Sequence, residues 1–339
     1  MLGGLALALA AIAIVAAGVG AVPLSPGQVV AAMAAPLGVE LPWGLSPREQ
    51  LIVWTIRLPR VALAIVVGAG LGGAGAALQG LVRNPLADPR LVGVSDGAAL
   101  AAVGYLVLGA PLAAALPAVS PWLLPAAAFA GGLVSTRIAL GLARVDGETS
   151  SLRLILGGVA LSALAGAGTG LLLFVADDAQ LRSVAFWSLG SLGGATWSLV
   201  AAAALPIAVA LGLLLRHRDD LDRLLLGEAE ARHVGVEVEA VTRRVVLLVA
   251  LAVGAAVAAC GAIGFVGLVV PHLVRGWLGP SHRTLLLASA LGAAALLVGA
   301  DLVARTVAAP AEVPVGVITA LIGAPFLLAR VRGARAEGR

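Results

Sequence analysis

Lysine is absent from this chain, and all 22 of its basic residues are arginine. The phosphate-binding loop GxxxxGK[ST] depends on a lysine that reaches the nucleotide phosphates. The chain therefore cannot carry an ATP site of that kind, and a separate subunit must hydrolyse ATP if the protein works in ATP-driven transport. A membrane enzyme would need paired aspartates, a metal cluster or a nucleophile with its base, and the sequence shows none of these.

Cysteine is nearly absent as well. Cys260 stands alone, which excludes an internal disulfide, a zinc cluster and a thiolate-held iron–sulfur site, and we interpret it as a packing residue. The four histidines, His217, His233, His272 and His282, have no metal-ligand spacing, and we expect each at a solvated or helix-end position. The sequence therefore predicts no metal and no cofactor in this chain.

Charged residues are also scarce, at 12% of 339 residues, whereas hydrophobic residues make up 60% and the mean hydropathy is +1.06. This balance excludes an ordinary soluble domain. We expect an all-α polytopic membrane protein with about ten transmembrane helices and one transmembrane domain over residues 1–339. Its spans are predicted at Leu2–Val22, Val61–Val82, Gly97–Leu116, Trp122–Leu142, Leu154–Ala176, Leu189–Leu215, Val245–Ala262, Ile263–Leu278, Leu285–Ala304 and Val315–Ala329. Residues 245–271 carry no charge, so nine spans is the alternative.

The most informative stretch runs from Arg57 to Ala98. Its helix Val61–Val82 is rich in glycine, and Gly68 and Gly72 form a small-xxx-small pair that lets another backbone approach closely. The polar turn at residues 83–90 contains two prolines that cannot continue the helix. Ser95 and Asp96 after it are predicted to cap the next helix.

Arginine placement predicts the orientation, because cytoplasmic loops retain an excess of positive charge. With ten spans and the N-terminus inside, 17 of the 22 arginines are cytoplasmic, and five lie outside: Arg48, Arg57, Arg60, Arg182 and Arg305. We expect both termini in the cytoplasm. The net charge of +4 and the pI near 10.7 then reflect topology, and no nucleic-acid partner is expected.

The longest polar insert, at residues 216–244, is predicted to couple the membrane domain to a cytoplasmic partner. Within it, Leu221–Val241 fits two short amphipathic helices broken at Gly235. The alternative is an interfacial helix on membrane lipid. The carboxylates of Glu228 and Glu230 argue against that alternative, because anionic headgroups repel them.

Eight motifs follow one another from Arg57 to Phe326: RLPR at Arg57, RNPLADP at Arg83, GVSDGA at Gly93, FWSLGSL at Phe186, LGEAEARHVGV at Leu226, GAIGFVGLVVPHLVR at Gly261, ADLVAR at Ala300 and EVPVGVITALIGAPF at Glu312. With these motifs the chain resembles the FecCD-type permease subunits of the ABC importers for haem, ferric siderophores and cobalamin.

The resemblance implies a type II ABC importer permease in the bacterial inner membrane. It implies a homodimer with the pathway on its two-fold axis, two cytoplasmic ATPase subunits that bind ATP and magnesium, and a periplasmic substrate-binding protein. By the same resemblance the ATPase-coupling residues are Gly227, Glu228, Ala231, Arg232 and Gly235. The cytoplasmic gate is implied near Asn84, Leu86, Ser151 and Leu152.

Docking of the binding protein is implied at Arg57, Arg60 and Arg305, three of the five outer arginines. The alternative for Arg305 is an intrahelical pair with Asp301, four residues earlier. Asp301 is also the one residue on which a less favoured function, that of a secondary transporter, would depend.

The residues from Ala176 to Trp197 most resemble haem permeases, with ferric siderophore or cobalamin import as the alternatives. Arg182 in this stretch is predicted at the substrate entry, where a guanidinium would meet a haem propionate. The alternative is an ordinary ion pair with Asp177 or Asp178.

Overall fold

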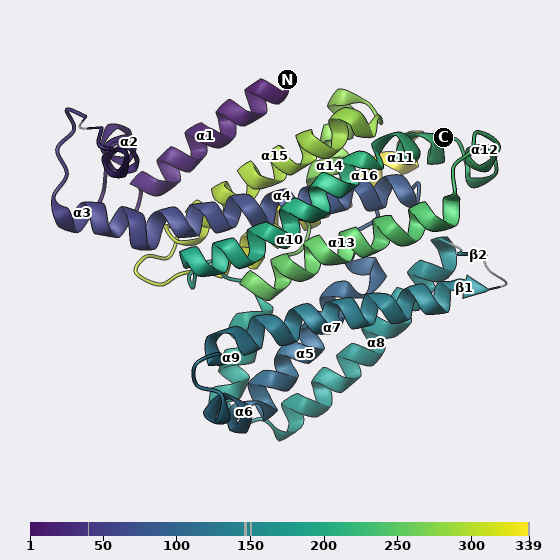
Figure 1. Cartoon of the computed structure of the whole chain (residues 1–339), viewed down its shortest axis with the longest axis horizontal. Helices are drawn as coiled ribbons and strands as arrows, with labels where there is room; N and C mark the ends of the chain where they lie inside the picture. Colours follow the sequence, from purple (N-terminus) through teal and green to yellow (C-terminus); the bar gives the residue numbers. More distant parts are fainter. Residues whose placement is uncertain (40, 146–147, 150, 338–339) are drawn as a thin grey trace.

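The structure is a computed structural model that describes residues 1–39, 41–145, 148–149 and 151–337. It is built almost entirely from helices (Figure 1). The helices are α1 (Leu2–Gly18), α2 (Pro26–Ala34), η1 (Ala35–Leu37), α3 (Pro47–Ile52), η2 (Val53–Arg57), α4 (Leu58–Leu81), η3 (Pro89–Val92), α5 (Val94–Leu108), α6 (Ala110–Ala115), α7 (Ser120–Ala143), α8 (Ser151–Val175), α9 (Asp178–Ser188), α10 (Trp197–Arg216), α11 (Arg218–Leu224), α12 (Glu228–His233), α13 (Val238–Cys260), α14 (Val266–Leu278), α15 (His282–Ala304) and α16 (Val315–Glu337). Two short strands, β1 (Arg144–Val145) and β2 (Glu148–Thr149), pair antiparallel after α7.

Helix α4 is the central element of the bundle. It packs against α10, α13, α14 and α15, and 78% of its apolar stretch is buried. A Cβ on Gly68 would lie 2.6 Å from the carbonyl oxygen of Ala293, and one on Gly72 would lie 2.3 Å from that of Ser289. The predicted close approach through this glycine pair is therefore confirmed, with α15 as the partner helix.

A second group of helices, α5, α7 and α8, packs beside this central group (Figure 1). α13 joins the two groups, because it contacts α4 and α10 on one side and α5 and α7 on the other. α8 is the least buried of the long apolar helices, with 11% of its apolar stretch buried. Its outer face is thus available for a neighbour.

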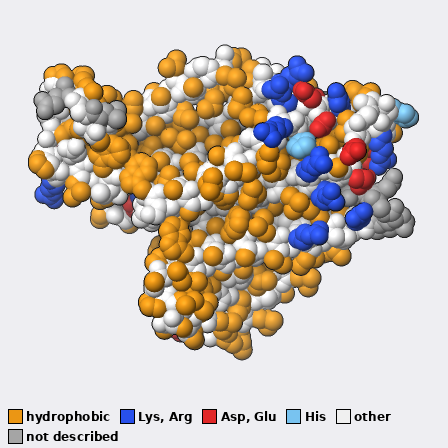
Figure 2. Space-filling model, in the orientation of Figure 1, with side chains coloured by type: hydrophobic (Ala, Val, Ile, Leu, Met, Phe, Trp, Pro, Cys, Tyr) orange, Lys and Arg blue, Asp and Glu red, His pale blue; other side chains and the backbone are white. Residues whose placement is uncertain are grey.

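The described residues contain six helices that are long and apolar enough to cross a membrane, and these contain α4, α7, α8, α10, α13 and α15. Four shorter apolar helices accompany them: Leu2–Gly18, Val94–Leu108, Val266–Leu278 and Val315–Ala329. Each of the ten predicted spans overlaps one of these helices, while the number that crosses the membrane stays a prediction. The space-filling view shows charged side chains gathered at the end where α11 and α12 lie and hydrophobic side chains over most of the remaining face (Figure 2).

Three predicted boundaries were wrong. The run Gly97–Leu116 is two helices, α5 and α6, because α5 ends at Leu108, with Gly109 as its C-cap, before Pro111. The run Leu189–Leu215 becomes helical only at Trp197, where Thr196 caps α10. Ser95 and Asp96 do not cap α5 either, since Gly93 precedes its first residue and both side chains lie inside its first turn.

The break between α13 and α14 falls at residues 261–265, so the apolar run is divided where the sequence suggested. Gly261 has φ +73°, and a Cβ on it would lie 2.1 Å from the carbonyl oxygen of Trp187. Only glycine fits this turn, because it combines a positive φ with a close approach to the last turn of α9. Cys260, directly before it, is 6% exposed, which confirms its packing role.

Candidate functional site

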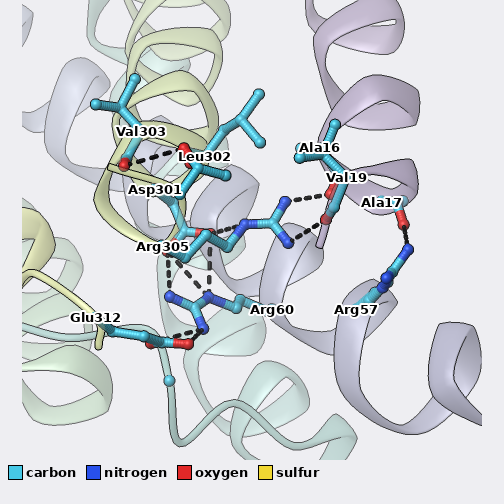
Figure 3. Close-up of polar contacts among 12 residues, drawn as sticks. Ala16, Ala17, Val19, Arg57, Arg60, Asp301, Leu302, Val303, Arg305 and Glu312 are labelled. Carbon is cyan, nitrogen blue, oxygen red and sulfur yellow. Dashed lines mark hydrogen bonds and ion pairs between the residues drawn. The ribbon is translucent and has the colours of Figure 1, made fainter. Parts of the chain in front are cut away.

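At the end of the molecule where α4 begins, Arg60 is held by two carboxylates (Figure 3). Its Nε and Nη2 donate to Asp301 at 2.9 to 3.1 Å, and its Nη1 donates to Glu312 at 2.8 and 2.9 Å. Asp301 is 2% exposed, whereas Glu312 is 49% exposed. The same guanidinium therefore has one buried partner and one partner that water reaches.

Arg57 and Arg305 hold the end of α1 through its backbone (Figure 3). Arg57 Nη1 donates to the carbonyls of Ala17 and Gly18 at 2.8 and 2.7 Å, and Arg305 Nη1 donates to that of Val19 at 2.9 Å. These carbonyls are the acceptors that the last turn of a helix leaves unsatisfied, so the arginines complete the C-terminal end of α1.

All three predicted docking arginines thus have partners inside the chain. Arg305 Nε lies 3.6 Å from Asp301 Oδ2, so the intrahelical pair that was the alternative for Arg305 is present. The three arginines and Glu312 nevertheless line one cavity of about 700 Å³. Sequence reasoning brought the arginines together correctly but missed Glu312 and the α1 carbonyls.

The predicted coupling segment forms α11 and α12. Its helices are separated at Gly227, which has φ +122°, and not at Gly235 as predicted; Gly235, with φ +86°, separates α12 from α13. Ala231 is fully buried and fixes α12 to the bundle, while Arg232 pairs with Glu239 of α13 at 3.2 Å. α12 is therefore a short helix with one face exposed and the opposite face held against the bundle through Ala231.

α11 is tied to α15 by a contact that the sequence analysis did not find. Asp222 accepts hydrogen bonds from the backbone N–H of His282 at 2.6 Å, from its Nδ1 at 2.7 Å and from the Ser281 hydroxyl at 2.8 Å. Burial alone would raise the pKa of Asp222, but these hydrogen bonds outweigh it and lower the pKa. His282 is fully buried at the first position of α15, so its predicted place at a helix end is confirmed. His272 is partly exposed in the middle of α14 and packs on Phe326 of α16.

Two of the predicted gate residues, Asn84 and Leu86, lie in a loop that contacts this segment. Leu86 is exposed, and its backbone N–H donates a hydrogen bond to Asn84 Oδ1 at 2.9 Å. Arg83, at the head of the same loop, lies 3.8 Å from Glu228 of α12. The side chain of Ser151 lies outside the described residues, and Leu152 is 65% exposed at the start of α8. The Arg83–Glu228 ion pair therefore connects the coupling segment to the loop that carries Asn84.

α8 exposes a row of large apolar side chains to its surroundings, including Leu156, Leu164, Leu171 and Phe174. On its buried side Gly158 contacts η3: a Cβ there would lie 1.8 Å from the carbonyl oxygen of Leu91. The Ser162 hydroxyl donates to Asp96 of α5. One face of α8 is therefore packed against η3 and α5, and the opposite face is uncovered.

Arg182 lies on the exposed surface of α9. Asp177, its predicted alternative partner, instead caps α9 by accepting the N–H groups of Ala179 and Gln180 at 2.9 Å. No ion pair of Arg182 occurs among the described residues. The guanidinium is therefore placed to meet an anion from solution.

Comparison with known proteins finds relatives over nearly the whole chain. The model of the FecCD transport family matches residues 7–332. The chain is 47% identical over 290 residues to the hemin transport system permease protein HmuU of Yersinia pestis, covering 84% of this chain and 85% of that protein. It is 44% identical over 292 residues to the cobalamin import system permease protein BtuC of Halobacterium salinarum, covering 86% and 76%. A solved metal-chelate type ABC transporter in an inward-facing conformation has a TM-score of 0.83 to this chain at 32% identity, covering 98% of each.

Proposed function

Because this chain belongs to the FecCD transport family and is a permease of an ABC importer, we propose that its cargo is haem. The observation that carries the proposal is the exposed Arg182 on α9, in a chain 47% identical to a hemin permease. A guanidinium pairs well with a carboxylate, and propionates are the anionic groups of haem. Cobalamin is the second candidate, supported by the 44% identity to a cobalamin permease.

The assembly we propose has two copies of this chain, two ATPase subunits and one substrate-binding protein. The uncovered face of α8, with Leu164 and Phe174 exposed at 69% and 88%, supports a second copy as its neighbour. Of the predicted coupling residues, Glu228, Arg232 and Gly235 are accessible and support ATPase docking, while Gly227 and Ala231 are buried and would hold α12 in position. Charged side chains gather at that end of the molecule, which supports its placement in the cytoplasm, with both termini inside and the membrane being the bacterial inner membrane (Figure 2).

We expect Arg182→Ala to slow haem uptake about tenfold, equivalent to about 1.4 kcal/mol, when the permease is reconstituted in liposomes with its ATPase and binding protein. The reason is the loss of a cation that attracts propionates, so the rate with the haem propionate diester should not change. Basal ATP hydrolysis should also stay the same, since α9 is remote from the coupling segment.

Arg48→Ala is the matched control, because Arg48 is another exposed arginine and lies on α3. It should leave haem uptake at the wild-type rate. An unchanged ratio of haem to diester rates in Arg182→Ala would remove the entry role of this residue. Cobalamin uptake without haem uptake by the wild-type protein would overturn the assignment of haem.

We further propose that the binding protein docks at the cavity lined by Arg57, Arg60 and Arg305. Glu312 is the replaceable partner in it, since it is half exposed while Asp301 is buried. Glu312→Gln should therefore free one side of Arg60 for an acidic group of the binding protein and strengthen docking several-fold at low salt, and Glu312→Arg, which adds a further cation, should strengthen it more. The affinity of the purified binding protein for each variant can be measured with the permease immobilised on a surface. Equal affinities at low and high salt for both variants would show that the arginines serve only the fold.

A further inference from the structure

An apolar groove lies between α7 and α10, with the last turns of α13 as its floor. α13 packs against both helices, and two cavities of about 570 and 220 Å³ lie between α7 and α10. The two cavities share five lining residues: Trp122, Pro125, Leu199, Ala258 and Ala259. They therefore form one continuous groove. The groove is separate from the arginine cavity and from the coupling segment.

The walls of the groove are suited to a hydrocarbon chain. Its floor is made of small side chains, Ala255, Ala258 and Ala259, and its rim carries aromatic rings, including Trp122 and Phe129. None of the described residues that line it is charged. An occupant would therefore gain from burial of apolar surface alone, with no ion pair to orient it.

Hydroxyl groups occur at one end of the groove only. Ser191 Oγ accepts the backbone N–H of Gly193 at 3.1 Å, and Thr196 Oγ1 accepts that of Leu199 at 3.2 Å. Each of these two hydroxyls still has its own hydrogen to donate. Ser183, the third, already donates to the carbonyl of Ala179 at 2.9 Å. The groove thus offers two donors at one end and hydrocarbon along the rest.

The position of the groove matches one leaflet of the membrane. α7, α10 and α13 are all long enough to span the membrane (Figure 1). The lining comes from the first turns of α7 and α10 and the last turns of α13, and at one end also from α5, α9 and the loop after α9. This is the end where α9 lies, the outer side in the orientation proposed above. Tryptophan at such a level is typical of the membrane interface.

We propose that this groove binds one acyl chain of an outer-leaflet phospholipid, with its ester oxygens at Ser191 and Thr196. The charge of the headgroup has little influence, because no charged side chain lines the site. The cargo does not fit as well: haem would bring two carboxylates to a lining that offers no cation among the described residues.

The test counts phospholipids bound to the delipidated, detergent-solubilised full chain by native mass spectrometry, with dioleoyl phosphatidylethanolamine or dioleoyl phosphatidylglycerol as the probe. Ala202→Trp fills the groove from the exposed side of α10 and should weaken binding of the tightest lipid at least tenfold. Ala208→Trp makes the same change on an exposed face of α10 that does not line the groove, and it should bind lipid as the wild type does. The two lipids should bind about equally.

Ala258→Leu, on the floor, serves as a second variant if Ala202→Trp does not fold, and it should weaken lipid binding in the same direction. Equal lipid binding by Ala202→Trp and Ala208→Trp would overturn the proposal. Displacement of the lipid by haem would reassign the groove to cargo, and loss of dimers in Ala202→Trp alone would reassign it to a subunit interface. The readout is bound lipid, so failure of the haem assignment leaves the result interpretable.

Discussion

Asp301→Ala is expected to destabilise the folded permease by about 3 to 5 kcal/mol, the usual cost of removing one partner from a buried ion pair. Asp301 is 2% exposed and is the buried counter-ion of Arg60, whose side chain is itself 11% exposed. Without it, Arg60 and Arg305 would face each other with Glu312 as their one remaining acidic neighbour in the cluster. Thermal and detergent-induced unfolding of the purified protein, followed by circular dichroism, measures the loss.

Glu312→Gln is the matched control, because it removes the other carboxylate that binds the same guanidinium. Glu312 is half exposed, and exposed ion pairs contribute about 0 to 1 kcal/mol. We therefore expect a small change in the unfolding temperature for Glu312→Gln and a large one for Asp301→Ala. Comparable losses in the two variants would contradict the view that burial decides the strength of this cluster.

The membrane-spanning core was largely predictable from local sequence. Uninterrupted apolar runs located all the long helices, because a run of about 20 apolar residues matches the length of helix that crosses the hydrocarbon core. The pair Gly68 and Gly72 predicted a tight helix crossing, and α15 supplies the partner backbone. Boundaries inside apolar runs were less predictable, as at Gly109 and Thr196, because hydropathy does not distinguish a helix from an apolar loop that other helices bury.

Contacts across the chain could not be predicted in the same way. Arg57 binds backbone carbonyls 39 and 40 residues earlier, and a carbonyl leaves no mark on the side-chain pattern. The bond from His282 to Asp222 spans 60 residues and joins a helix start to a polar insert. Ser281 and His282, polar residues directly before an apolar run, indicated a helix start. Nothing local in the sequence identified Asp222 as the carboxylate that they would bind.

In the coupling segment, Glu228→Arg is expected to lower the amount of cargo transported per ATP hydrolysed at least tenfold while the membrane helices stay folded. The substitution places a second arginine beside Arg83, where Glu228 now lies at 3.8 Å, and it reverses the charge of the exposed helix α12. Gly235→Val should act in the same direction, because its backbone φ of +86° costs a β-branched residue about 1 to 2 kcal/mol. Uptake and phosphate release, measured in the same liposomes, give the ratio.

The charge-swapped pair Arg83→Glu with Glu228→Arg separates two roles of Glu228. If its main role is to connect α12 to the loop that carries Asn84, the swap restores the attraction and should recover most of the transport per ATP. If Glu228 acts mainly by contacting the ATPase, the swap should stay uncoupled and the ATPase should bind more weakly to both variants. Full transport by Glu228→Arg and Gly235→Val alike would refute the docking of the ATPase at α12. Because Glu228 is 30% exposed and Arg83 is 44% exposed, neither change should alter the unfolding temperature much, so a loss of coupling would report on transmission and not on folding.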